Sequence, residues 1–154
     1  KHCVFDDRVN EFLAIAGGFD GFLFGTPVHW AAADGFLTSF MGRAFYVDQL
    51  AGLNTFYLKP AAGVISARRA GTTSTWDQIN KYFGILEMPI VTSQYWNHVH
   101  GRTPDEVRQD IEGMQTMRTL ARNMAYMLRC REASSKAGVP MPKREPVTFF
   151  NFIH

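Results

Sequence analysis

Short apolar runs alternate with amphipathic segments along the chain. Residues 6–16 place apolar side chains at spacings of three and four, which is the period of a helix with one buried face. Residues 20–25 then form a continuously apolar run, as expected for a strand that is buried on both sides. This alternation is typical of an α/β fold in which helices cover a parallel sheet.

The same alternation continues through the middle of the chain. It predicts, in chain order, a helix over 33–45, a strand over 61–66, a helix from Thr73 or Ser74 to Gly84, and a strand over 89–93. Phe36 is expected to face the core from the first of these helices. Residues 46–59 are expected to form a looser connection.

The last helix has the clearest start signal in the sequence. Thr103 is a capping residue, Pro104 occupies the first helical position, and Glu106 stands at the reciprocal capping position. One long helix is expected to run from there to Gly138. The tail that follows is rich in Pro and Phe, so we expect it to pack on this subunit or on a neighbouring one.

Two segments that follow predicted strands carry the candidate chemistry. Pro27 has no N–H for a sheet ladder, so residues 26–30 are expected to be a loop. Residues 67–73 are expected to form a second loop. Because ligands of open α/β sheets lie outside the carboxyl ends of strands, both loops should converge on one edge.

Composition narrows the range of functions. The 154 residues are enough for one domain, and the net charge of +2 is too small to indicate nucleic-acid or membrane-surface binding. No apolar run approaches the roughly 20 residues of a membrane helix. Cys3 and Cys130 do not form a disulfide framework, which favours a reducing cytoplasm. The aromatic content of 14% is consistent with a dense core, a flat-ligand site or a subunit interface.

The sequence contains no obvious constellation of catalytic side chains. It has neither a nucleophile triad nor a carboxylate pair, so we expect no catalytic acid, base or nucleophile. His98 and His100 alternate in the manner of metal ligands, but no further ligand stands at motif spacing. We therefore expect no metal site, and we expect these histidines at the rim of a ligand site or at a subunit contact.

Residues 20–30 and 63–73 resemble the NAD(P)H-dependent FMN reductase and iron-sulfur flavoprotein branch of the flavodoxin-like proteins. Residues 88–97 and the capped last helix look similar to the same branch. The resemblance implies an α/β, flavodoxin-like, doubly wound parallel sheet of order 2-1-3-4-5 in one domain over residues 1–154. Strands 3–5 would lie in this chain. The first strand and the phosphate-binding loop are expected to lie outside it.

The resemblance also implies that the two loops hold FMN. The first loop would lie along the flavin ring, and the second would donate backbone N–H groups to the ring edge. The candidate FMN-binding residues are Thr26, Pro27, Val28, His29, Trp30, Ser66, Ala67, Arg68, Arg69, Ala70, Gly71 and Thr72.

Several of these assignments have alternatives. Trp30 would contact the ring or pack on the sheet, and Thr72 would contact the ligand or cap a helix. One of Arg68 and Arg69 is expected to face the flavin. His29 has no acidic neighbour in sequence, which favours a contact role over a general-acid role.

The implied function is an FMN-dependent NAD(P)H oxidoreductase. Hydride would pass from the nicotinamide to the flavin, and electrons would pass on to a flavin, a quinone or another small acceptor. The alternatives are an electron-transfer flavoprotein reduced by a protein partner, and an interaction module with a degenerate flavin site. The resemblance further implies a homodimer or homotetramer. Cys3 resembles the last cysteine of an iron-sulfur cluster motif or is an ordinary free thiol.

Overall fold

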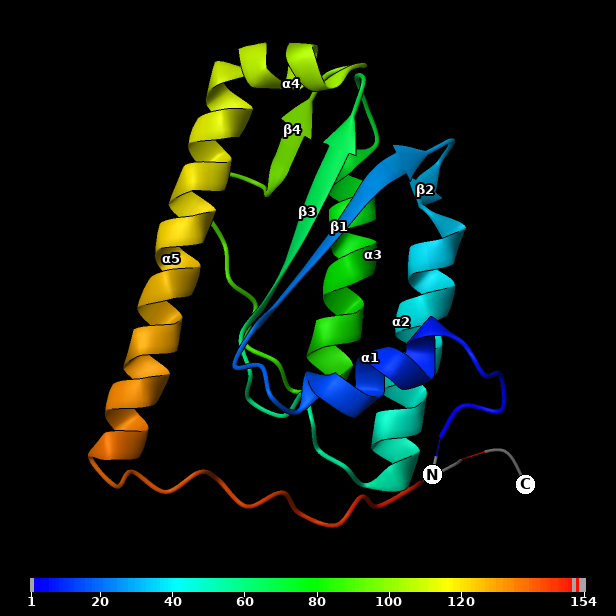
Figure 1. Cartoon of the computed structure of the whole chain (residues 1–154), viewed down its shortest axis with the longest axis vertical. Helices are drawn as coiled ribbons and strands as arrows, with labels where there is room; N and C mark the ends of the chain where they lie inside the picture. Colours follow the sequence, from blue (N-terminus) through cyan, green and yellow to red (C-terminus); the bar gives the residue numbers. More distant parts are fainter. Residues whose placement is uncertain (1, 151, 153–154) are drawn as a thin grey trace.

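Three parallel strands form the centre of the computed structural model, which describes residues 2–150 and 152 (Figure 1). A short fourth strand pairs antiparallel with the first, and the sheet order is β2-β1-β3-β4. The elements are α1 (Arg8–Ala16), β1 (Phe22–His29), β2 (Ala32–Ala33), α2 (Gly35–Ala51), β3 (Ala61–Ala67), α3 (Thr72–Ile85), β4 (His98–His100), α4 (Pro104–Gln109) and α5 (Ile111–Lys136).

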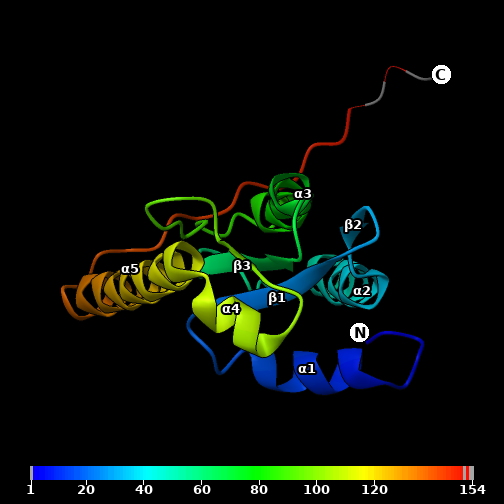
Figure 2. The same cartoon turned by 90° about the horizontal axis from the view of Figure 1, so that it is seen from above.

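The helices build two hydrophobic cores around the sheet. The larger core is formed where α1, α2 and α3 pack with β1 and β3, and the smaller one lies under α5. Figure 2 shows α5 set apart from the other three long helices. The larger core is dense in aromatic rings, and Phe56 lies at its centre with ring centroids 5.1 Å from Phe22 and 4.8 Å from Phe45. Much of the high aromatic content therefore serves the core.

Helix α2 differs from the prediction in its length and in the side chains that it buries. It runs to Ala51, so the start of the expected loose connection is helical. Its buried positions are Met41, Ala44, Phe45 and Asp48, and Phe36 is 90% exposed rather than buried. Because the helix begins only at Gly35, Phe36 lies in its first turn, where the core no longer reaches.

The expected strand over 89–93 was wrong. Only Ile90 makes a bridge there, opposite Ala61, and the chain then leaves the sheet before returning as β4. The buried Asn97 closes the excursion, since its side-chain amide donates to the carbonyl oxygen of Val91 (3.1 Å) and accepts from the hydroxyl of Ser93 (2.8 Å). One bridge therefore replaces the strand expected over 89–93, and the strand β4 lies at residues 98–100, beyond the expected range.

The long last helix is also divided. The Thr103 side chain accepts from the backbone N–H of Glu106, as the start signal predicted, but this helix, α4, ends after six residues. Asp110 separates it from α5 and accepts hydrogen bonds from the N–H groups of Gly113 (2.9 Å) and His100 (2.7 Å). The carboxylate ties the end of β4 to the start of α5, which is why the chain bends there.

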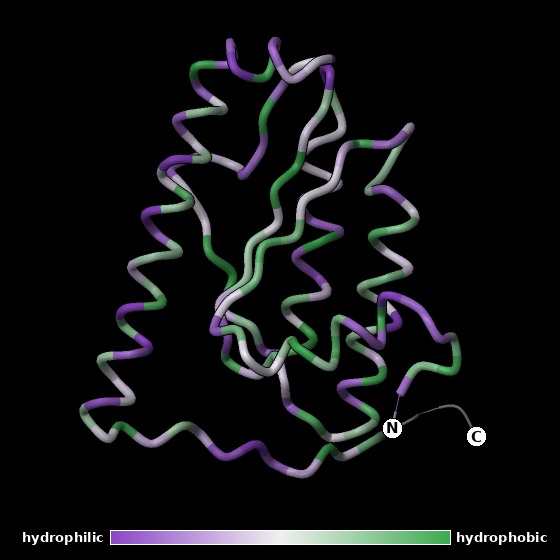
Figure 3. The backbone as a smooth tube through the Cα atoms, viewed as in Figure 1, coloured by the Kyte–Doolittle hydropathy of each residue, from purple (hydrophilic) through white to green (hydrophobic). Residues whose placement is uncertain are grey.

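Helix α5 spans 26 residues, and hydrophilic and hydrophobic residues alternate along it (Figure 3). Within the described residues, no helix is sufficiently long and apolar to cross a membrane. On the side opposite β3, β1 pairs only through Val28 and His29 in the described part of the chain, and Leu23 is exposed. A further strand at that edge stays a prediction.

Candidate functional site

The first candidate loop is mostly strand. β1 continues to His29, contrary to the expectation of a loop over residues 26–30. Pro27 is the last residue of β1 that pairs with β3, and Val28 is the first that pairs with β2. The missing N–H of the proline therefore falls where the strand changes its partner, so it interrupts no continuous ladder.

A tight hairpin carries Trp30 at its tip. The N–H of Ala31 donates to the carbonyl oxygen of His29 (2.9 Å), and Trp30 has a φ of 63°. A bulky residue in this left-handed region is uncommon and strained, and such positions cluster at functional sites. The Trp30 side chain is 100% exposed, so it does not pack on the sheet. Its contact with a flavin ring stays a prediction.

His29 has an acidic partner that sequence reasoning missed. Its Nδ1 lies 3.2 Å from a carboxylate oxygen of Asp34, five residues along and across the hairpin. The same carboxylate accepts from the N–H of Phe36 (2.8 Å), and the Asp34 N–H donates to the hydroxyl of Thr26 (2.9 Å). Asp34 thus caps α2 and also orients the imidazole of His29.

The second candidate loop leads into a helix that no side chain caps. Ala67 ends β3, residues 68–71 are exposed, and α3 begins at Thr72. The cap expected from Thr73 or Ser74 is absent, because Gly71 occupies the N-cap position with a φ of 90°. The first N–H groups of α3 lack a side-chain acceptor, which makes this end suitable for oxygen atoms of a ligand.

The two segments meet at the carboxyl end of the sheet. A Cβ on Gly71 would lie only 2.9 Å from Cγ1 of Val28, so the loop backbone rests directly on the β1 side chain. Farther along, the N–H of Ala33 donates to the side-chain oxygen of Gln78 on α3 (3.1 Å). Ser66, next to Ala67, pairs in register with Pro27. The structure therefore brings the two candidate segments together at one edge of the sheet, although Thr26, Ala67 and Thr72 are buried there.

A small polar cavity lies beside this surface. It has a volume of about 200 Å³ and is lined by Tyr95, His98, His100, Asp110, Glu112, Gly113 and Thr116. His100 pairs with Ala67, so the cavity adjoins the end of β3. The imidazole rings of His98 and His100 lie 4.8 Å apart. Within the described chain, no group of three or more His, Cys, Asp or Glu is arranged to hold a metal ion.

His98 should titrate below an ordinary histidine. Burial lowers the pKa of His98 and the nearby His100 lowers it further, against the opposite influence of Asp110 and Glu112. Because the folded-state pKa is depressed, His98 disfavours the folded state as the pH falls through the ordinary histidine range. NMR titration of the His98 ring should give a pKa below that of unfolded His, and His100→Gln should raise it. A midpoint at or above the unfolded value would contradict this assignment.

Cys3 is a buried free thiol. Its sulfur accepts a hydrogen bond from Nη1 of Arg43 (3.7 Å), and its N–H donates to the side chain of Asn10 (2.9 Å). Cys130 is also free and is exposed on α5. These contacts give Cys3 a structural place at the entry to α1, and its role as a cluster ligand stays untested.

Comparison with known families decides the class of the protein. The model of the family described as NADPH-dependent FMN reductase matches residues 1–103, a span that contains both candidate segments. The chain belongs to this family. The resemblance seen in the sequence is confirmed, and family membership places the chain among the flavin-dependent oxidoreductases.

Individual relatives agree with this assignment. The chain is 26% identical over 138 residues to an iron-sulfur flavoprotein of Methanocaldococcus jannaschii, covering 82% of this chain and 68% of the relative. A Trp repressor binding protein from Bacillus subtilis has a TM-score of 0.59 at 15% identity, covering 78% of this chain and 70% of its own. A flavodoxin, WrbA-like protein from Agrobacterium tumefaciens has a TM-score of 0.52 at 11% identity, with 77% and 78% covered. At these identities the solved structures show the fold alone, and they confirm the flavodoxin-like fold.

Proposed function

We propose that this chain functions as an FMN-dependent NAD(P)H oxidoreductase that passes electrons to a small acceptor such as a flavin or a quinone. The observation that carries the proposal is the contact of Gly71 with Val28, which joins the two motif segments of a member of the NADPH-dependent FMN reductase family into one open surface. RosB, a structural neighbour with a TM-score of 0.57 at 14% identity, was solved with bound 8-demethyl-8-formylriboflavin-5'-phosphate. A flavin monophosphate is therefore the ligand class that we assign.

The residues present fit the ring of such a ligand. Gly71 has no side chain, so Val28 packs directly on its backbone and the two segments lie close together. Residues 68–71 are exposed, which leaves this loop open to a ligand on its outer side. The N–H groups at the start of α3 would donate to carbonyl oxygens at the ring edge, and Arg68 or Arg69 would stabilise negative charge on the ligand. Trp30 would lie along the ring.

Bound FMN would supply the acceptance of hydride from a nicotinamide and the release of electrons to the acceptor. The residues of the chain would bind the flavin, orient it toward the nicotinamide and shield it from water. His29, held by Asp34 at 3.2 Å, is oriented by that carboxylate and would contact the ligand or its substrate. We also propose a homodimer or homotetramer in the cytoplasm, in keeping with the family resemblance.

The deciding experiment is FMN titration of the purified protein, followed by anaerobic addition of NADH or NADPH. Saturable binding and bleaching of the flavin absorbance near 450 nm at about one equivalent of nicotinamide would support the oxidoreductase. Binding without bleaching, together with rapid reduction by a protein donor, would favour an electron-transfer flavoprotein. An absence of binding by the complete protein would overturn the proposal in favour of an interaction module.

The two arginines provide a matched pair of variants. Both Arg68 and Arg69 are exposed and lie next to each other in the second segment. We expect Arg68→Gln and Arg69→Gln to differ in FMN affinity, with a loss of about tenfold for the one that faces the ligand, or about 1.4 kcal/mol. Equal affinities would remove the proposed charge interaction. Thermal unfolding of the flavin-free variants serves as the control, since neither exposed arginine should change it.

A further inference from the structure

The chain ends in an extended segment that we call the C-terminal arm, residues 139–150 and Phe152. It leaves α5 after Gly138 and contains neither helix nor strand in its described residues. The arm runs along the base of the molecule, the side at which β1 and β3 begin, opposite the edge that carries Val28 and Gly71 (Figure 1). Its three prolines restrict the backbone, so the arm loses less entropy when it becomes ordered.

The first half of the arm is attached to its own base. The Tyr57 hydroxyl donates to the carbonyl oxygen of Pro142 (3.3 Å), and Arg144 lies 5.1 Å from the centre of the Tyr57 ring. The guanidinium of Arg144 also donates to the side-chain oxygen of Asn54 (2.6 Å) and pairs with Glu87 (2.5 Å). These contacts hold the arm at a defined point.

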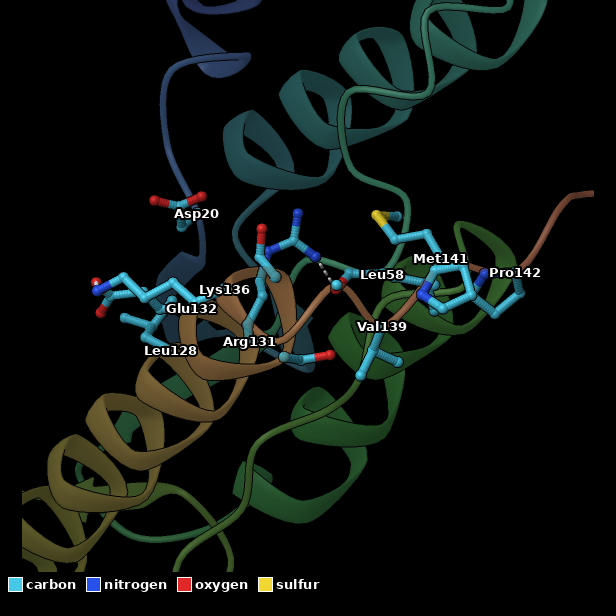
Figure 4. Close-up of a pocket in the computed structure, with 13 residues that line it drawn as sticks. Asp20, Leu58, Leu128, Arg131, Glu132, Lys136, Val139, Met141 and Pro142 are labelled. Atoms are coloured by element: carbon cyan, nitrogen blue, oxygen red, sulfur yellow. Dashed lines mark hydrogen bonds and ion pairs between the residues drawn. The ribbon is translucent and has the colours of Figure 1, made fainter.

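The attached half also forms one wall of a pocket. Together with the end of α5, it lines a half-open pocket with a volume of about 800 Å³ (Figure 4). Arg131 spans this space and donates to the carbonyl oxygen of Leu58 (3.1 Å), while Val139 and Pro142 form the arm's side. The arm is therefore supported along its first half before its apolar end begins.

The second half of the arm is apolar and uncovered. Val147, Phe149, Phe150 and Phe152 are all exposed, and Phe149 reaches 92%. The rings of Phe150 and Phe152 contact each other at 4.5 Å. Figure 2 shows the arm projecting away from the helices and the sheet. A contiguous group of exposed aromatic side chains is rare on a monomer and marks an interaction site.

We propose that this end of the arm docks on the base of a second copy of this chain, so that two copies exchange arms about a two-fold axis. The base carries exposed apolar side chains beside the attachment point, since Leu53 precedes Asn54 and Ile85 stands two residues before Glu87. In an isologous contact the same surface patch of each copy must contain both the docking segment and the surface that receives it. Here the apolar half of the arm starts beside the acceptor surface, since Arg144 contacts Asn54 and Glu87, so a single two-fold rotation places the arm of each copy on the base of the other.

The area available suits a stable dimer. Three phenylalanines bury about 150–250 Å² each when they are covered. Two exchanged arms and the surfaces beneath them would then bury about 2,000 Å², within the range of specific interfaces, which begins at about 1,200 Å². The contact lies at the base, so it leaves the edge with Val28 and Gly71 open and does not depend on flavin binding.

The test is the molar mass of the complete protein in solution, measured by light scattering over a range of concentrations. We expect a dimer, and we expect the combined change Phe149→Ser, Phe150→Ser and Phe152→Ser to raise its dissociation constant at least about 100-fold. Ile85→Glu should weaken the dimer from the acceptor side. Phe36→Ser is the matched control, because Phe36 is as exposed as the arm residues but lies near the opposite edge.

Each other outcome counts against the proposal. A wild-type monomer, a dimer that survives both the arm and the Ile85→Glu changes, or a dimer lost in Phe36→Ser would overturn it. Since the arm residues are exposed in the single chain, the serine variant should keep its far-ultraviolet circular dichroism spectrum. Cross-linking of mixed light and heavy isotope-labelled chains separates exchange between copies from folding back within one chain, and only mixed pairs between arm and base agree with exchange.

Discussion

Phe56→Ala is expected to reduce the free energy of unfolding by about 3–5 kcal/mol, a large part of the stability of a domain of this size. Phe56 is fully buried, and its ring contacts those of Phe12, Phe22 and Phe45. The change to alanine removes the ring that contacts all three of these side chains. The cavity that remains is bordered by residues on α1, β1 and α2, which cannot all move in to fill it. Urea unfolding of the complete protein, with unchanged slope, measures the loss.

Phe36→Ala is the matched control for this experiment. The residue type and the substitution are the same, but Phe36 is exposed, so the free energy of unfolding should change by no more than about 0.5 kcal/mol. Similar losses for the two variants would mean that the aromatic cluster around Phe56 does not hold the core together. Neither measurement involves flavin, so both test the fold alone.

Phe36 and Phe56 also show which structural features a local sequence pattern can predict and which it cannot. The 3.6-residue period predicted the helix that contains Phe36, but its start depends on Asp34, whose carboxylate caps α2. Phe56 lies in a segment without periodicity, between Asn54 and Leu58, which both have positive φ angles. Nothing local indicates that this segment folds under the helices, since its burial arises from contacts distant in sequence.

The wrong prediction of a strand over residues 89–93 has the same origin. The composition of residues 89–93 favoured a strand, but in the structure their sheet contact is reduced to the single bridge of Ile90. Asn97 decides this, because its buried amide satisfies Val91 and Ser93 and stabilises a loop in place of a ladder. A local pattern indicates the propensity of a segment, whereas the partner of each backbone group depends on the tertiary structure.

The convergence of the two candidate segments on one edge of the sheet was predicted from the sequence, whereas the binding of FMN by their residues stays a prediction. Parallel strands end at one edge, so two motifs that follow two such strands must approach each other. Their meeting at Val28 and Gly71 follows from topology and needed no side-chain detail. The hairpin strand β2 and the pairing of His29 with Asp34 were missed, because a two-residue strand carries no period and the hairpin turn brings Asp34 back to His29.

Gly71→Ala is expected to lower the free energy of unfolding by about 1–3 kcal/mol and to weaken FMN binding at the same time. A side chain at this φ of 90° is strained, and its Cβ would press on Val28 at 2.9 Å. The backbone would have to move to relieve the strain and the contact with Val28. This movement would shift the start of α3, whose N–H groups we propose donate hydrogen bonds to the ligand. Chemical unfolding of the flavin-free protein measures the first effect, and FMN titration measures the second.

The same helix supplies an opposite control. Gly84 lies inside α3 with open space around it, so Gly84→Ala should raise the free energy of unfolding by up to about 1 kcal/mol. Adding Val28→Ala to Gly71→Ala removes the steric contact but not the backbone strain, so it should restore part of the stability lost to that contact. Complete restoration would assign the whole effect to Val28. A stable Gly71→Ala protein with normal FMN affinity would show that neither the left-handed glycine nor its contact shapes the flavin site.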